Sequence, residues 1–323
     1  MKAIVQDTYG SADVLHLEEI ERPSIKNDEV LVEVRAAGLD RGTWHLMAGK
    51  PYLIRIMGFG FRAPKQPISG LDLSGTVVAV GSDVSRFSVG DEVFGAGKGS
   101  FAEYAVARED NLVNKPLGLT FEQAAVVPVS GTTAIQGLRD VGQIEDGQSV
   151  LIIGASGGVG TFAVQIAKSY GAQVTGVCST SKVDLVRSLG ADDVVDYTHE
   201  DFADGVHKYD LILDIGGNSS LSRLRRALTR TGTLVIVGGE DGGNWTGGIG
   251  RQLRAFVMSL FLRQRLTSFI SKASGADLES LIPLIDAGDV TPIIDKTYPL
   301  AEAPTAMNEM VEGRVRGKVA VTI

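Results

Sequence analysis

A glycine-rich turn between a predicted strand and a predicted helix is the clearest chemical signal in the chain. The apolar run Val150–Ile153 leads into Gly154-Ala-Ser-Gly-Gly-Val-Gly160, and a helical pattern follows over Val159–Tyr170. Gly160 would let the helix lie close to the strand, and the free N–H groups of the turn would face a pyrophosphate. Ala155 stands where the usual fingerprint has its first glycine, but the strand–turn–helix context still predicts a dinucleotide site. The predicted pyrophosphate contacts are Ser156, Gly157, Gly158 and Val159.

The residues that follow the second strand of this pattern predict the choice of cofactor. The strand Gln173–Cys178 runs into Ser179-Thr-Ser-Lys182, where an Asp or Glu would bind the ribose 2′-OH of NAD. This segment contains no carboxylate to repel a 2′-phosphate, whereas hydroxyls and a lysine can bind one. We therefore expect NADPH, held by Ser179, Thr180 and Lys182. The serines and the threonine are also good caps for a helix that starts near Lys182, and both roles can hold together.

The elements that position these residues alternate in type from about Glu122 onward. Helical patterns of 10–15 residues separate continuous apolar runs, which is typical of strands covered on both faces of a parallel sheet. The predicted strands are Val150–Ile153, Gln173–Cys178, Asp193–Asp196, Leu211–Asp214 and Leu234–Val237. The predicted helices are Val159–Tyr170, Lys182–Leu189 and Leu221–Leu228, with Gly171 and Gly190 as stops.

The first third of the chain has a different texture, with short β-rich segments between Gly and Pro turns. Its predicted strands are Ala3–Gln6, Glu29–Ala36, Gly75–Val80, Glu92–Phe94 and Phe101–Ala107. After Leu266 the pattern predicts a helix over Ala276–Ala287, a segment Thr291–Tyr298, a helix from Ala301 and a final strand Lys318–Ile323. The fold class is therefore α/β, with a doubly wound parallel sheet and a separate β-rich lobe.

Length and composition limit the classes of function. A chain of 323 residues is long for one core and predicts two lobes, and a net charge of −8 gives no general field for nucleic acid or anionic lipid. No nucleic-acid partner and no membrane contact are expected. The single cysteine, Cys178, excludes an internal disulfide, and with the absence of a leader pattern it predicts a cytoplasmic protein.

Several short motifs together resemble a known family, the zinc-independent medium-chain dehydrogenase/reductases, and most of all their NADPH:quinone oxidoreductase-like branch. The motifs are Ala36-Ala-Gly-Leu-Asp40, Gly70-Leu-Asp-Leu-Ser-Gly-Thr-Val, Val89-Gly-Asp-Glu-Val-Phe-Gly95, Gly99-Ser-Phe-Ala-Glu-Tyr104, Gly131-Thr-Thr-Ala134, Gly154–Gly160, Leu189-Gly-Ala191, Asp196-Tyr197 and Gly317-Lys318. The resemblance implies a GroES-like catalytic domain over 1–126 and 273–323 and a Rossmann cofactor-binding domain over 127–272. It also implies a homodimer through the edge of the Rossmann sheet, near Leu266–Ser271.

The same resemblance extends the predicted cofactor site. It implies that Tyr197 lies near the adenosine and that Thr133, Gly238 and Gly239 border the nicotinamide. Two basic residues near the C-terminus, Arg314 and Lys318, resemble family residues that reach the cofactor, although they could equally be surface charges.

No zinc site is expected. The zinc-dependent relatives have a Cys at the position of Asp40 and Gly-His-Glu where this chain has Gly70-Leu71-Asp72, so these ligands are missing. One cysteine and four scattered histidines do not supply either usual zinc site. Without a Lewis acid, reduction of an electrophilic acceptor is a better assignment than oxidation of simple alcohols.

The expected reaction is hydride transfer from NADPH to a quinone or an enone, with the cofactor performing the difficult step. In the family, the segment Leu39–Tyr52 faces the nicotinamide, and its candidate proton donors are Asp40, His45 and Tyr52. Asp40 departs from the Asn common in quinone reductases. Met57 and Gly58–Phe61 would wall a flat acceptor or fill the core of a loop.

Two questions stay open at the level of sequence. The amphipathic segment Arg251–Arg265 predicts a helix that faces the core, covers the acceptor, contacts a second subunit or lies on a membrane surface. Alternatives to quinone or enone reduction are a reductase of one biosynthetic enoyl or carbonyl substrate and a non-enzymatic NADPH-binding regulatory protein.

Overall fold

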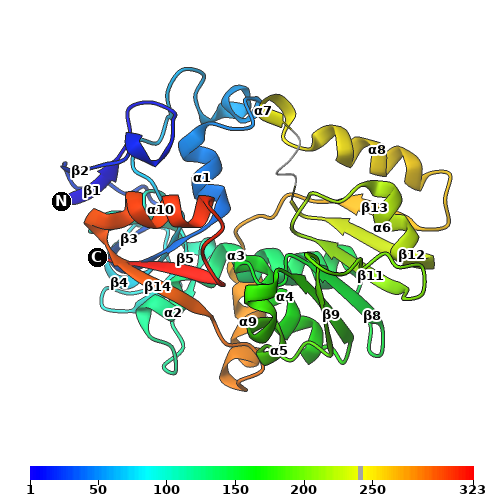
Figure 1. Cartoon of the computed structure of the whole chain (residues 1–323). Helices are drawn as coiled ribbons and strands as arrows, with labels where there is room; N and C mark the ends of the chain where they lie inside the picture. The colour runs from blue at the N-terminus through cyan, green and yellow to red at the C-terminus, as the bar shows by residue number, and fades with distance from the viewer. Residues whose placement is uncertain (239–242) are drawn as a thin grey trace. The chain divides into compact units, whose positions relative to one another are not determined.

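The computed structural model describes residues 1–238 and 243–323, which form two units of the chain (Figure 1). The β-rich unit comprises Met1–Thr132, Lys272–Asp286 and Pro292–Ile323. The parallel-sheet unit comprises Thr133–Ser271 and Ala287–Thr291. The first division falls inside a helix, after Thr132, whereas the sequence placed it at residue 126.

The parallel-sheet unit contains a six-stranded sheet in the order β10-β9-β8-β11-β12-β13, and all its neighbouring strands are parallel. Its strands are β8 (Ser149–Ile153), β9 (Gln173–Cys178), β10 (Asp193–Asp196), β11 (Tyr209–Asp214), β12 (Leu228–Ile236) and β13 (Arg265–Ser268). Its helices and helical turns are η4 (Gln136–Gly142), α4 (Gly158–Ser169), η5 (Thr180–Lys182), α5 (Val183–Ser188), α6 (Leu221–Ala227), α7 (Gly243–Thr246) and α8 (Ile249–Ser259). This strand order confirms the predicted doubly wound Rossmann sheet.

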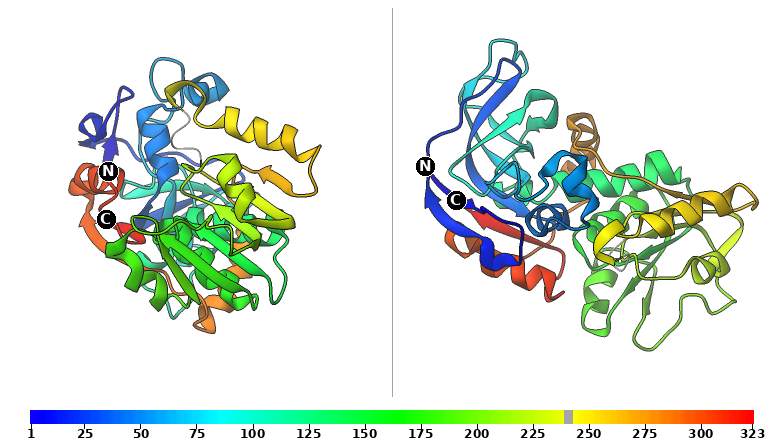
Figure 2. Two further views of the ribbon diagram at one scale, coloured as in Figure 1. Left: turned by 45° about the vertical axis from the view of Figure 1, so that its right-hand side comes forward. Right: turned by 90° about the horizontal axis from the view of Figure 1, so that it is seen from above.

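The winding direction of this sheet reverses between β8 and β11. Chain connections run outward through α4 and α5 on one side of that point and through α6 and α8 on the other, and right-handed crossovers put these two sets on opposite faces. The central strands are buried on both faces, and α4 is buried from Gly160 to Ala167, which explains its nearly continuous apolar sequence. Figure 2 shows α8, in yellow, beside the β13 edge of the sheet.

The β-rich unit is built on a seven-stranded sheet in the order β14-β15-β3-β4-β5-β7, with β6 paired to β3, and on the hairpin-like pair β1-β2. Its strands are β1 (Lys2–Val5), β2 (His16–Glu19), β3 (Glu29–Leu39), β4 (Asp72–Val80), β5 (Glu92–Ala96), β6 (Tyr104–Arg108), β7 (Leu112–Asn114), β14 (Ile294–Pro299) and β15 (Lys318–Thr322). Its helices are α1 (Arg41–Ala48), α2 (Phe121–Ala125), α9 (Gly275–Asp286) and α10 (Ala303–Val311), and α3 (Pro128–Ile135) spans the division between the units. Shorter turns are η1 (Ala12–Val14), η2 (Arg55–Phe59), η3 (Glu109–Asn111) and η6 (Leu300–Glu302).

The C-terminal strand completes the sheet of the β-rich unit. β15 pairs antiparallel with β3, Val319 facing Leu39 and Thr322 facing Ala36, and β14 pairs parallel with β15. The final strand and the helices before it therefore agree with the sequence prediction. Within the described ranges, no helix combines the length and the apolarity needed to span a lipid bilayer.

Candidate dinucleotide site

The carboxyl end of β8 forms the predicted glycine turn. Gly154 takes a left-handed conformation with φ of +88°, and the N–H groups of Gly154 and Ala155 both donate to the carbonyl of Val177 at 3.1 Å. Gly157 is the N-cap of α4 and the next two residues form its first turn. The first N–H groups of a helix have no intrahelical acceptor, so this turn presents donors to an anion. Ser156 is buried in the turn, and Gly157, Gly158 and Val159 are half-buried.

Two glycines of the turn have different physical roles. A Cβ added at Gly160 would lie 2.1 Å from the carbonyl oxygen of Gly154 and 2.7 Å from the backbone of Ala155, so only glycine lets the helix approach the strand. A Cβ added at Gly157 would meet only the Gly154 oxygen, at 3.4 Å. Gly160 therefore serves the fold, whereas the space at Gly157 is available to a phosphate. The turn fits a dinucleotide in this respect.

The predicted 2′-phosphate residues follow the carboxyl end of β9. Ser179 holds the N-cap position of η5, but its side chain makes no capping hydrogen bond there, so the capping role that its type allows is not used. Lys182 lies one turn later, and its N–H donates to the Ser179 carbonyl at 2.9 Å. Tyr197 follows β10 and is 59% exposed, with its N–H on the carbonyl of Cys178 at 3.1 Å. These residues therefore share one edge of the sheet.

Asp196 is a carboxylate at this edge that the predicted site did not include. Thr180 Oγ1 donates to Asp196 Oδ2 at 2.6 Å, and Thr198 donates to Oδ1 through its hydroxyl at 2.7 Å and its N–H at 3.0 Å. The Thr180 hydroxyl, followed by the bonds from Thr198 and His199, holds the pKa of Asp196 well below its usual range. The expectation that no carboxylate stands at the end of β9 is wrong, because the neighbouring strand β10 supplies one. Parallel strands end at the same edge, and Asp196 faces Cys178 in the register, so the strand prediction already contained this signal.

The carboxyl end of β11 carries a buried carboxylate. Asp214 accepts the N–H of Gly217 at 3.1 Å and pairs with the guanidinium of Arg251 from α8. Burial raises the pKa of Asp214, and the charge of Arg251 offsets part of that rise. Nε and Nη1 of Arg251 are buried without a hydrogen-bond partner among the described residues. Gly238 lies beside this turn, because a Cβ there would meet the carbonyl oxygen of Ile215 at 2.1 Å.

Of the other two predicted nicotinamide neighbours, Thr133 and Gly239, the structure describes only the first. Thr133 is buried in α3. Gly239 lies outside the described residues. The structure thus brings the turn after β8, Ser179–Lys182, Tyr197, Asp214 and Gly238 to the carboxyl ends of neighbouring strands in one sheet, around the point where the winding reverses. Ligands of doubly wound sheets bind at this place.

The proton-donor candidates lie on and after α1 in the β-rich unit. Asp40 is the N-cap of α1 and accepts from Thr43 with both oxygens, at 2.8 Å from N and 3.1 Å from Oγ1. His45 Nδ1 donates to the carbonyl of Lys50 at 2.8 Å, which orients the ring and leaves Nε2 without a partner among the described residues. Tyr52 lies under the guanidinium of Arg55, 4.7 Å from its ring centre. Of the three, His45 has a nitrogen that no local contact uses.

The segment after Tyr52 does not fill a core. Ile56, Met57, Phe59 and Phe61 are all exposed, so the alternative of a packed loop interior is wrong. Tyr9 holds the segment through its hydroxyl, which donates to the carbonyls of Phe59 and Gly60 at 3.0 and 2.7 Å. A flat acceptor as the occupant of this surface stays a prediction.

Lys318 and Arg314 are both engaged within the β-rich unit. Lys318 is 2% exposed, with Nζ 3.6 Å from Oδ2 of the fully buried Asp72. Asp72 Oδ1 accepts the N–H of Val129 at 3.0 Å, whereas Oδ2 and the Lys318 ammonium have no hydrogen-bond partner among the residues that the structure describes. Burial raises the pKa of Asp72 well above its ordinary value, and the charge of Lys318 counteracts this. Arg314 is exposed and pairs with Glu312. Contact of either with a cofactor stays a prediction.

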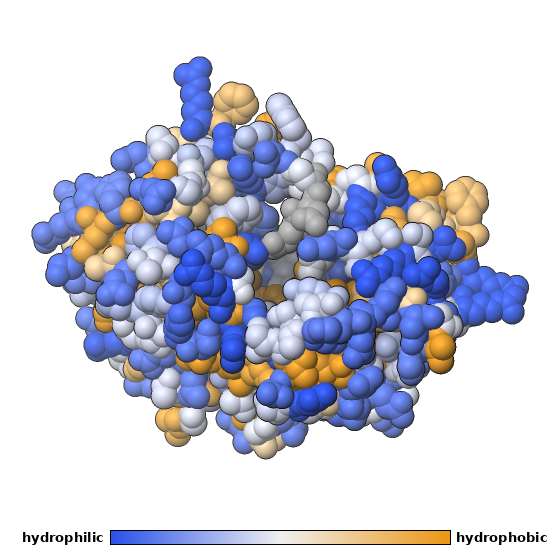
Figure 3. Space-filling model, viewed as in Figure 1, coloured by the Kyte–Doolittle hydropathy of each residue, from blue (hydrophilic) through white to orange (hydrophobic). Residues whose placement is uncertain are grey.

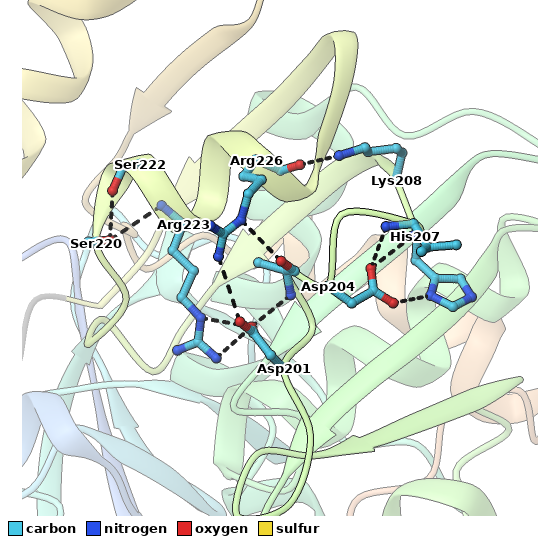
Figure 4. Close-up of polar contacts among 10 residues, drawn as sticks. Asp201, Asp204, His207, Lys208, Ser220, Ser222, Arg223 and Arg226 are labelled. Carbon is cyan, nitrogen blue, oxygen red and sulfur yellow. Dashed lines mark hydrogen bonds and ion pairs between the residues drawn. The ribbon is translucent and has the colours of Figure 1, made fainter.

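A cluster of charged side chains in the parallel-sheet unit joins the loop after β10 to α6 (Figure 4). Asp201 accepts from Arg223 at 2.9 Å and lies 3.7 Å from Arg226. In the same loop, Asp204 accepts from His207 at 2.7 Å, and this bond is the main reason that the pKa of Asp204 falls to about 2. Both carboxylates have basic partners, and the Lys208 ammonium donates to the carbonyl of Arg226, so these contacts fix the loop against α6.

Two domains of this geometry, a parallel dinucleotide-binding sheet and a β-rich sheet closed by the C-terminal strand, define a two-domain dehydrogenase fold. Family models match as an alcohol dehydrogenase GroES-like domain over residues 26–117 and a zinc-binding dehydrogenase over residues 189–321. The chain belongs to the medium-chain dehydrogenase/reductases, in their quinone oxidoreductase-like branch, and is an oxidoreductase. A non-enzymatic role is therefore not favoured.

Individual relatives cover nearly the whole chain. It is 34% identical to the mitochondrial NAD(P)H oxidoreductase RTN4IP1 of Bos taurus, over all of this chain and 89% of that protein. It is also 34% identical to the chloroplastic NADPH-dependent alkenal/one oxidoreductase of Arabidopsis thaliana, over 99% and 79%. The solved quinone oxidoreductase of Coxiella burnetii superposes with a TM-score of 0.88 at 28% identity, over 100% and 99% of the two chains.

The matched family description names zinc, but the residues here do not fit that ion. Asp40 already caps a helix with both oxygens, and Asp72 is buried against Lys318. Among the residues that the structure describes, no group of three or more His, Cys, Asp or Glu side chains is placed to hold a metal.

Proposed function

We propose that this oxidoreductase uses NADPH, without a metal, to reduce a quinone or an α,β-unsaturated carbonyl. The observation that carries the proposal is the turn Gly154–Gly160, where only glycine fits at residue 160 and open space remains at Gly157. Relatives named for NAD(P)H and for alkenal/one reduction support the same reaction class. When bound, NADPH supplies a hydride from C4 of its nicotinamide.

The residues that would hold the cofactor follow the strand ends in order. N–H groups of the turn Ser156–Val159 would bind the pyrophosphate, and Tyr197 would lie along the adenosine. Thr133, Gly238 and Gly239 would border the nicotinamide, with Arg314 and Lys318 as further contacts. Gly238 suits a place beside the nicotinamide because the backbone is crowded there. A Cβ at this residue would lie 2.1 Å from the carbonyl oxygen of Ile215, so only glycine fits.

NADPH is proposed over NADH because Lys182 and the hydroxyls of Ser179 and Thr180 follow the carboxyl end of β9, where they would surround the 2′-phosphate. Asp196 opposes this choice, since its carboxylate holds the Thr180 proton. We expect the Lys182 ammonium to decide the balance through a charge-assisted bond to the phosphate. Lys182→Ala should lower kcat/KM with NADPH about tenfold or more and leave that with NADH unchanged. Arg187→Ala, on the exposed side of α5, is the matched control.

Protonation of the reduced acceptor is assigned to His45. An acceptor that has gained a hydride carries an extra electron pair and needs one proton to reach the hydroquinone or the saturated ketone. His45 donates through Nδ1 to Lys50, so the proton must come from Nε2–H of its imidazolium form, which becomes the neutral Nδ1–H imidazole after the transfer. Asp40 and Tyr52 stay as weaker candidates, because the oxygens of Asp40 are occupied by Thr43.

The reaction class is tested by NADPH consumption with a panel of quinones, enones and simple aldehydes, each with and without a chelator. We expect turnover of quinones or enones that the chelator does not change. Turnover of aldehydes or alcohols that the chelator abolishes would overturn the proposal. NADPH binding with no turnover of any member would point instead to one specific biosynthetic enoyl or carbonyl substrate.

We also propose that the protein forms a homodimer and is cytoplasmic. β13 lies at the edge of the parallel sheet, where the predicted homodimer contact near Leu266–Ser271 would form. Sedimentation velocity tests whether the protein is a dimer. A cytoplasmic location stays a prediction from the single cysteine.

A further inference from the structure

The outer face of α8 is apolar and uncovered. Positions 249, 253, 256, 257 and 260 repeat at helical spacing, and all five side chains are exposed, among them Phe256 at 61%. Phe261, directly after the helix, is 84% exposed. Figure 3 shows hydrophobic side chains among hydrophilic ones in the region where Figure 1 draws α8. Scattered exposed apolar residues are common on proteins, but a continuous face of this kind marks a contact surface.

The opposite face of α8 already has its partner. Ala255 is buried, and Met258 and Leu262 pack on the core of the parallel-sheet unit. Ser259 Oγ accepts the N–H of Leu266 at 3.0 Å. The expectation that this segment turns its apolar side to the core therefore holds only for the smaller face, and the larger one remains uncovered.

The segment that contains this helix carries charge of one sign. From Gly243 to Ala276 the sequence contains five Arg or Lys residues and no Asp or Glu, in a chain whose net charge is −8. Arg254, on the helix, and Arg263, just after it, are exposed, and neither has an ion pair with a described residue. Helices that lie in the interface of anionic membranes have this composition. Phenylalanine and leucine form one face of the helix, and arginines lie at the margin of that face.

We propose that α8 and the turn to Arg263 form a docking surface for an anionic phospholipid bilayer. The helix would lie in the plane of the interface, with Phe256, Leu260 and Phe261 among the acyl chains and Arg254 and Arg263 at the lipid phosphates. A second copy of the chain fits less well, because pairing two such helices face to face brings arginines against arginines without any carboxylate on either helix.

The helix is tied to the reactive edge of its own unit. Arg251, in the first turn of α8, pairs with Asp214 at the carboxyl end of β11. Docking would thus bring the edge of the sheet that holds the predicted cofactor residues next to lipid. One consequence rests on the proposed function: an acceptor dissolved in the bilayer, such as a long-chain quinone, would be reached without first entering water.

Flotation of the full-length protein with vesicles tests the surface. The probes are vesicles of phosphatidylcholine alone and of phosphatidylcholine with phosphatidylglycerol, at low and high salt. We expect the protein to float with the anionic vesicles and to be released by salt. Phe256→Ser/Phe261→Ser should lower partition about tenfold or more, and Arg254→Glu/Arg263→Glu should do the same for anionic vesicles. The matched controls are Leu117→Ser/Val206→Ser and Arg187→Glu/Arg230→Glu, exposed positions that should change partition less than twofold.

Several outcomes would overturn the proposal. Wild-type protein that does not float with either vesicle, or control pairs that lose as much partition as the helix variants, would remove it. A wild-type dimer that the phenylalanine variant converts to monomer, without vesicle binding, would assign the face to a second copy. NADPH oxidation with a water-soluble quinone and no vesicles tests the proposed reaction separately, and both helix variants should retain it.

Discussion

The carboxyl edge of the parallel sheet and the segment Leu39–Phe61 of the β-rich unit carry the two halves of the predicted chemistry, and they are built differently. At the sheet edge the backbone provides the site: the turn at Gly154 and Gly157 presents N–H groups that do not depend on any side chain. In the segment Leu39–Phe61 the side chains must act, and Asp40 and Tyr52 are already engaged in helix capping and in a contact with Arg55.

This difference explains why one half is easier to interpret from sequence than the other. The position of a backbone site follows from strand order, because parallel strands end at one edge. The role of a side chain depends on which neighbours reach it, and those neighbours come from other parts of the chain. Variants in either region test this difference.

The largest effect is expected at the buried ion pair of the β-rich unit. Lys318→Met leaves the Asp72 carboxylate buried without its counter-charge, which should cost about 3–5 kcal/mol of unfolding free energy. Asp72→Asn/Lys318→Met removes both charges and keeps an oxygen for the Val129 N–H, so it should recover most of that loss. Urea unfolding of the three proteins measures both values. A loss below about 1 kcal/mol in Lys318→Met would show that the pair is not a structural element.

The glycine turn should separate fold from binding. Gly160→Ala places a methyl group against the Gly154 carbonyl and should destabilise the protein by about 1–3 kcal/mol or more, since backbone must move. Gly157→Ala should leave the Tm of the cofactor-free protein unchanged and weaken NADPH binding about tenfold or more, because its methyl group occupies the phosphate approach. Thermal unfolding and fluorescence titration measure the two properties. Unchanged NADPH affinity in Gly157→Ala would place the pyrophosphate elsewhere.

The proton donor is tested by removing one ring nitrogen. His45→Asn keeps a donor near the Lys50 carbonyl but has no counterpart of Nε2, so turnover at saturating NADPH should fall about tenfold or more with an unchanged Tm. His207→Asn, in the loop of Figure 4, is the control and should have no effect. Full activity of His45→Asn, together with a loss in Tyr52→Phe, would transfer the role to Tyr52.

The smallest effect is expected at the single thiol, which lies at the end of β9. Burial, with Asp196 adding to it, raises the pKa of Cys178 to about 11. At pH 8 only about one thiol in a thousand is therefore ionised, and alkylation should be slow in the native protein and fast after unfolding. Mass spectrometry after iodoacetamide treatment measures the rate. Rapid native labelling would mean that this edge of the sheet opens more readily than its burial indicates.

The sequence predicted the parallel sheet well because its strands are continuous apolar runs and its helices end at glycines. β9 and β10 have the predicted bounds, and α4 begins one residue before its predicted start. Side-chain partners across strands were harder to predict. Asp196 reaches Thr180 from the neighbouring strand, and Lys318 contacts Asp72 from the far end of the chain. The number of residues between the partners does not indicate either contact.

The helix α8 shows another limit. Its periodicity predicted two faces correctly, but periodicity does not say which face the fold covers. The smaller face, with Ala255, contacts the core, while the phenylalanines remain outside. Only packing against β13 and the Arg251–Asp214 pair decides the orientation.

Conjugate hydride transfer from NADPH is tested most directly by following the hydride itself. NADPH with deuterium at both C4 positions is incubated with the protein and an enone, and the product is analysed by mass spectrometry and NMR. The proposed reaction predicts one deuterium at the β-carbon of the saturated ketone. Deuterium at the former carbonyl carbon, or a product without deuterium, would contradict conjugate hydride transfer by this protein.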